Sequence, residues 1–136
     1  METIIVNVSW ENKNFAASLG DNVPGAVVFT AKTFEELVRE AHDALAFHVE
    51  GMIEDGDEVP EWLSKGEYEF EFNYVDTASL LRSCERFASI AAISRATGIN
   101  QHLLSHYATG LKKPRPKQRQ RIIDGLHSIG RQLMAF

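Results

Sequence analysis

The residues of this chain best suited to chemistry lie in the stretch RATGINQHLLSHYATGLKKPRP, which begins at Arg95. A glutamine side chain can form the paired hydrogen bonds that adenine offers in the major groove of DNA. Gln101 is therefore the candidate for direct base reading, and its polar neighbours are candidates for contacts to bases or phosphates. The candidate set is Asn100, Gln101, His102, Ser105 and His106.

A group of basic residues follows this polar segment. Lysine and arginine side chains bind DNA phosphates, which gives affinity and salt dependence without reading the base sequence. Pro114 and Pro116 stiffen the segment, and Pro116 can open a further helix. We expect phosphate contacts from Lys112, Lys113, Arg115 and Lys117.

Local signals predict the elements that must hold these side chains. Ile90 and Ile93 lie at the spacing that packs a first helix. Gly98 can turn the chain without a Cβ penalty, and Asn100 is a good N-cap for a second helix. Gly110 is placed to end that helix. The second helix should turn Leu103, Leu104 and Tyr107 inward and Gln101, His102, Ser105 and His106 outward.

The arrangement resembles the Cro/repressor-type helix-turn-helix, whose members share the pattern G-I-x-x-x-x-L-S-x-Y-x-x-G-x-K-x-P. The resemblance covers residues 81–133, and Ser94 stands where alanine is usual. It implies a five-helix DNA-binding module. A plain helical bundle with a basic loop is the alternative. His102 and His106 also have the one-turn spacing of zinc ligands, but no third ligand is evident, so we expect no metal. The matching residues are Gly98, Ile99, Leu104, Ser105, Tyr107, Gly110, Lys112 and Pro114.

The charge of the chain is divided unevenly along its length. Residues 1–76 carry four basic against seventeen acidic residues, a net charge of −13. Residues 77–136 carry ten basic against two acidic residues, a net charge of +8. Such asymmetry indicates two surfaces with different partners, one of them a polyanion. We therefore expect two domains, an acidic one over 1–76 and a basic one over 77–136.

The acidic half shows the periodicities of a small α+β domain. Strand patterns cover residues 4–10, 15–19 and 26–30, and the stretch EYEFEFNY alternates aromatic with acidic side chains. Thr33 and Glu36 form a capping-box pattern that opens a helix over about 34–53. The segment EDGDEVPEW is expected to be a loop; it lacks the spacing of a calcium site. The predicted fold is an antiparallel sheet with one helix, followed by an all-α domain.

The stretch VPGAVVFTAKTFEELVREAHDALAFHVEGMIEDGDEVPEWL, residues 23–63, resembles antitoxins of the HicB type. That resemblance implies a truncated ribonuclease-H-like sheet without catalytic function, which binds a small basic ribonuclease toxin, HicA. It also implies a C-terminal module that represses the toxin–antitoxin operon by binding operator DNA as a homodimer or higher homo-oligomer. An acidic surface can mimic RNA toward a basic nuclease. Candidate toxin contacts are Glu67, Glu69 and Glu71.

Composition limits the remaining function classes. No apolar run approaches the length of a membrane span, the first residues lack a signal pattern, and Cys84 is the only cysteine. We expect a cytoplasmic protein with no cofactor and no enzymatic activity. A transcription regulator with an effector-sensing acidic domain is the alternative. A magnesium-dependent nuclease is disfavoured because residues 4–10 contain no acid.

Overall fold

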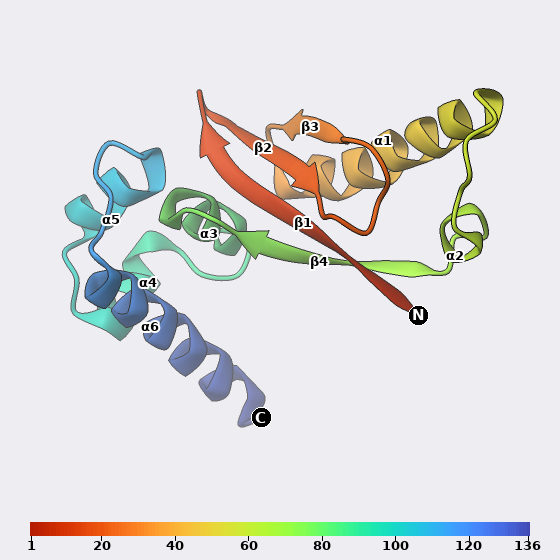
Figure 1. Ribbon diagram of the computed structural model, residues 1–136. Helices are drawn as coiled ribbons and strands as arrows, with labels where there is room; N and C mark the ends of the chain where they lie inside the picture. The colour runs from red at the N-terminus through yellow and green to blue at the C-terminus, as the bar shows by residue number, and fades with distance from the viewer. The chain divides into compact units, whose positions relative to one another are not determined.

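The computed structural model describes all residues from Met1 to Phe136, with four strands and six helices in a mixed α+β chain (Figure 1). The chain divides into two compact units. We call Met1–Val75 the acidic unit and Asp76–Phe136 the basic unit. None of the helices combines the length and the apolar composition that crossing a membrane requires.

The acidic unit is built on a four-stranded sheet. Its strands are β1 (Glu2–Glu11), β2 (Asn14–Leu19), β3 (Val28–Ala31) and β4 (Tyr68–Tyr74), in the order β3-β2-β1-β4. β1 pairs antiparallel with β2, and β2 pairs antiparallel with β3.

The prediction of an antiparallel sheet was wrong for its last strand. β4 pairs parallel with β1, from Glu2 opposite Tyr68 to Val8 opposite Tyr74. Parallel strands need a long crossover connection, and the chain between β3 and β4 supplies one. The crossover contains α1 (Phe34–Glu54) and a second, short helix, α2 (Glu61–Ser64). α2 was not predicted: it follows Pro60 and includes the end of the segment expected to be a loop.

Helix α1 covers one face of the sheet (Figure 1). Its start follows from the capping box: Glu36 N–H donates to Thr33 Oγ1 at 3.1 Å, and Lys32 N–H donates back to Glu36 Oε2 at 3.0 Å. Because apolar side chains recur at the helical period, α1 buries one stripe against the sheet. That stripe consists of Leu37, Ala41, Leu45 and Met52.

Strand β4 alternates as its sequence predicts. Its aromatic side chains are half-buried on the side of α1, where Phe34 packs against Phe72 with ring centroids 5.3 Å apart. Glu69 and Glu71 are exposed and point to the other side of the sheet. The acidic unit thus has one covered sheet face and one open face.

The basic unit consists of four helices rather than the five that the resemblance implied. They are α3 (Thr77–Cys84), α4 (Ile90–Thr97), α5 (Gln101–Thr109) and α6 (Pro116–Met134). Residues 116–134 form one continuous helix with Pro116 in its first turn, which is the position where proline is tolerated. The shared core contains Leu81, Ala88, Ile93, Ile99, Leu104, Tyr107, Ala108 and Ile122.

Candidate functional site

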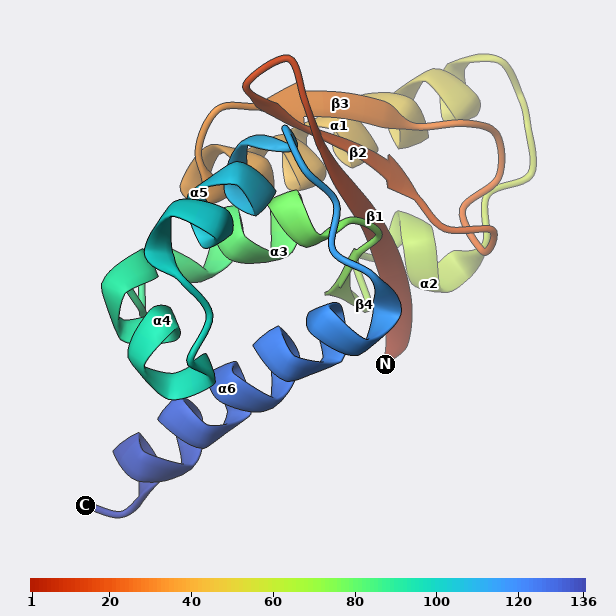
Figure 2. The same ribbon diagram turned by 90° about the vertical axis from the view of Figure 1, so that its left-hand side faces the viewer.

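A tight turn of three residues joins α4 to α5 (Figure 2). Gly98 ends α4 in the left-handed conformation, with φ of +74°, and its N–H donates to Ser94 O. Asn100 Oδ1 then accepts from His102 N–H at 2.7 Å and from Leu103 N–H at 3.4 Å. The capping roles predicted for Gly98 and Asn100 are therefore confirmed.

Two hydroxyl groups fix the middle of this turn. Ser94 Oγ donates to Ile99 O at 2.6 Å. Thr97 Oγ1 donates to Ile93 O at 2.7 Å and accepts from Ile99 N–H at 3.1 Å. Both backbone groups of the buried Ile99 are thereby satisfied by side chains. The sequence predicts Ser94 only as a small residue that permits close packing, and these hydrogen bonds were not predicted.

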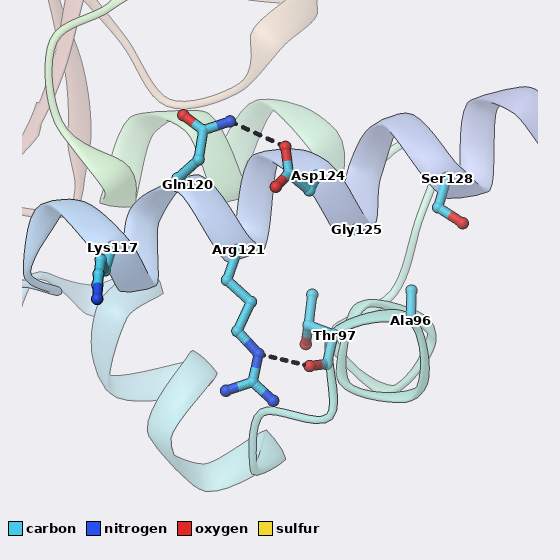
Figure 3. A pocket seen from close by; sticks show the side chains of 8 residues that line it. All are labelled: Ala96, Thr97, Lys117, Gln120, Arg121, Asp124, Gly125 and Ser128. Carbon is cyan, nitrogen blue, oxygen red and sulfur yellow. Dashed lines mark hydrogen bonds between the residues drawn. The ribbon is translucent and has the colours of Figure 1, made fainter.

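Helix α6 holds the end of α4 from the other side (Figure 3). Arg121 Nε donates to Thr97 O at 2.8 Å. A Cβ on Gly125 would collide with the Thr97 side chain, so only glycine allows the two helices to approach this closely. The roles of Arg121 and Gly125 were not predicted from the sequence, where a glycine in the interior of an amphipathic helix was the one available signal.

The polar side of α5 faces the solvent. Gln101, His102 and Ser105 are exposed, whereas Leu104 and Tyr107 are buried. Near the C-terminal end of α5, Arg82 Nε donates to Ala108 O at 2.8 Å. Gly110 ends the helix with φ of +81°. Hydrogen bonds thus hold α5 at both ends, and the exposed polar side chains lie in its first two turns.

His106 differs from the other candidates because it is half-buried and not fully outward-facing. Its Nδ1 has no hydrogen-bond partner, and its ring centroid lies 4.4 Å from that of His102. Desolvation by burial, with smaller contributions from His102 and Lys112, lowers the pKa of His106 from its usual range. No group of three or more His, Cys, Asp or Glu side chains is placed to hold a metal ion.

The predicted basic residues follow the C-terminal end of α5 in the chain. All four are exposed, and none forms an ion pair. The only acidic residues after Asp76 are Glu85, which pairs with Arg82 at 3.4 Å, and Asp124, which accepts from Gln120 at 2.9 Å. The positive charge of this surface is therefore uncompensated. The residues are Lys112, Lys113 and Arg115 in the segment before α6, and Lys117 in its first turn.

The candidate toxin contacts lie on the acidic unit. Glu69 and Glu71 are exposed on the open face of the sheet, and Glu67 is exposed just before β4. Thr3 Oγ1 donates to Glu69 Oε1 at 3.5 Å, and none of the three carboxylates pairs with a lysine or arginine. The row of acids predicted from the alternation is present as a solvated surface.

An acidic sheet unit joined to a basic helical unit defines a chain with two oppositely charged surfaces. Residues 3–100 match the family model described as HicB_like antitoxin of bacterial toxin-antitoxin system. The chain therefore belongs to this antitoxin family. The match spans the acidic unit and extends through α3 and α4 to Asn100. Among curated proteins and solved structures, none matches the chain.

Proposed function

We propose that this chain is a non-enzymatic antitoxin that neutralises a small HicA-type ribonuclease toxin and represses its own operon. The observation that carries the proposal is the pairing, within one chain, of a family-matched acidic unit with a basic unit that exposes a polar helix. An acidic surface suits a basic nuclease, and a basic surface suits DNA. The acidic unit is proposed to be the truncated ribonuclease-H-like toxin-binding domain.

The proposed DNA-binding element is a Cro/repressor-type helix-turn-helix formed by α4, the turn and α5. In such elements the N-terminal residues of the second helix reach base edges in the major groove. Gln101 is the proposed reader of adenine, with Asn100, His102, Ser105 and His106 beside it. Lys112, Lys113, Arg115 and Lys117 are the proposed phosphate contacts. Their exposure and lack of ion-pair partners support this role.

We propose that two or more copies act together on the operator. A two-fold dimer presents two recognition helices about one DNA turn apart, and therefore reads a palindromic site. Leu133 and Met134 at the end of α6, and Phe136 just after it, are exposed and offer apolar surface for such a contact. We therefore expect the chain to be a dimer when it binds DNA and its operator to be palindromic.

The proposed toxin-binding surface includes the open face of the sheet. Glu69 and Glu71 present carboxylates on this face and Glu67 presents one just before β4, and none of the three pairs with a lysine or arginine. Charge complementarity of this kind steers association and excludes like-charged partners. The open face would thus attract a basic toxin toward the acidic unit.

A growth assay tests the antitoxin role. The small reading frame adjacent to this gene is induced alone and together with the full chain. We expect growth arrest by the neighbour alone and rescue by co-expression. A harmless neighbour, or arrest that persists although the chain is present in excess, contradicts the proposal.

A further inference from the structure

An open groove lies on the acidic unit between the start of β3 and the C-terminal half of α1. Its volume is about 450 Å³. The residues that line it include Ala44, Phe47, His48, Met52, Asp55 and Asp57. All of these belong to the part of the chain that matches the antitoxin family.

One large apolar side chain at this groove is exposed to solvent: Phe47 is 80% exposed. Phe47 lies off the stripe that α1 buries, so folding of the acidic unit does not require it. Beside it the groove is lined by the apolar residues Ala44 and Met52. An exposed aromatic side chain next to apolar lining and a polar rim is typical of a surface that another molecule covers.

One residue that lines the groove, His48, is held in place by the turn before β3. His48 Nε2 and Pro24 O are 2.6 Å apart, in a hydrogen bond in which the ring nitrogen donates to the carbonyl. Gly25, with φ of +80°, lies so close to His48 that a Cβ there would be 2.9 Å from Cε1. The Pro24–Gly25 turn is therefore fastened to α1. A preformed site binds without the cost of ordering a loop.

The negative charge around the groove indicates which kind of molecule can bind there. From Glu40 to Ser64 the sequence contains eight acidic residues and no lysine or arginine. The last turn of α1, where the helix dipole is negative, also contains no basic residue. Nucleic acid, an anionic membrane and a second acidic unit would all be repelled here. A basic protein with an exposed apolar side chain is the complementary partner.

We propose that this groove is the anchor site for the basic toxin, and the inference rests on the proposed function above. An apolar side chain of the toxin packs against Phe47 over Ala44 and Met52, and flanking lysine or arginine side chains face Asp55 and Asp57. The apolar contact supplies the affinity, because desolvated aromatic anchors dominate interfaces. The carboxylates steer the approach and fix its register.

The test measures binding of the full chain to the purified protein encoded by the adjacent reading frame. Phe47→Ser should weaken the dissociation constant by about 30-fold or more, as expected for a hot-spot aromatic. Phe47→Gln, which removes the ring but keeps a good helix former, should also weaken binding. Ile53→Ser is the matched control, since Ile53 is a 59% exposed apolar residue of the same helix that does not line the groove. Unchanged unfolding midpoints establish that the variants are folded, and if one fails to fold the other decides.

A second comparison tests the charges. Asp55→Asn with Asp57→Asn should lower the association rate at low salt by about tenfold and flatten its salt dependence. The control removes two exposed carboxylates of the same unit outside the groove, by Glu11→Gln with Asp21→Asn. Equal effects of the two double variants contradict a specific role for the groove.

The outcomes separate this inference from the proposed function. If the wild-type chain binds its neighbour and Phe47→Ser binds equally well, the groove is not the anchor and the antitoxin role stands. If the wild-type chain does not bind, both fall. If Phe47→Ser changes the oligomeric state of the free chain but not its affinity for the neighbour, the groove is a self-contact and the inference is overturned.

Discussion

The side-chain methyl group of Thr97 lies in the space that a Cβ on Gly125 would occupy. This close approach sets the distance between α4 and α6, and the Arg121 bond to Thr97 O acts beside it. The turn that presents α5 begins at the next residue, Gly98. The position of the candidate DNA-reading helix therefore depends on packing on the far side of α4.

Gly125→Ala should destabilise the basic unit. Overpacking costs about 1–3 kcal/mol, whereas alanine in place of glycine in a helix returns about 1 kcal/mol. We expect a net loss of up to about 2 kcal/mol in the free energy of unfolding, measured by urea denaturation. Gly130→Ala is the matched control in the same helix, with nothing within 4 Å of the added Cβ. It should stabilise; the same sign for both variants would argue against the Thr97 contact.

Thr97→Val keeps the shape of the side chain but removes its hydroxyl. Ile99 N–H then loses its partner in a buried place, which costs about 1–3 kcal/mol. Thr109→Val is the control, because Thr109 is exposed and its neighbours can bind water. The midpoint of thermal unfolding should be clearly lower for Thr97→Val than for Thr109→Val. Equal midpoints would show that the Thr97 hydroxyl does not hold the turn.

Gln101→Ala and Lys113→Ala should affect DNA binding differently. Loss of a base contact costs about 1–3 kcal/mol on the operator and relaxes specificity at one position. Loss of a phosphate contact weakens binding to all duplexes and reduces the salt slope by about 1. Fluorescence anisotropy with the DNA upstream of this gene and with a scrambled duplex, at several salt concentrations, distinguishes them. Identical profiles for the two variants would contradict the assigned roles.

The stability of the basic unit should depend on pH through His106. Its pKa is lowered in the folded state, so the unfolded chain binds the proton more readily. As pH falls through the ordinary histidine range toward the folded pKa, the folded state loses stability. The free energy of unfolding between pH 8 and pH 5 should fall more for the wild type than for His106→Gln. Equal slopes would show that His106 does not contribute.

Features set by neighbouring residues were predictable from the sequence. The capping box of Thr33 and Glu36, the turn at Gly98 and Asn100, and the alternation along β4 each follow from a few adjacent side chains. The interactions that cause these features join residues within one helical turn or one strand, so they can be inferred from a short stretch of sequence.

Features set by distant contacts were not predictable. Parallel pairing of β4 depends on the path of a crossover, and Arg121 reaches Thr97 from 24 residues away. The bond between His48 and Pro24 O spans the same separation. Phe47 lies off the buried stripe of α1, but helical periodicity does not show that it lines a groove with residues beyond the end of that helix.

The central claim is tested most directly with purified components. The protein encoded beside this gene is incubated with RNA, and the full chain is added in increasing amounts. The account predicts that RNA cleavage stops when the chain reaches the concentration of binding sites on the toxin. RNA cleavage that continues in excess chain, or a neighbour that does not cleave RNA at all, would contradict it.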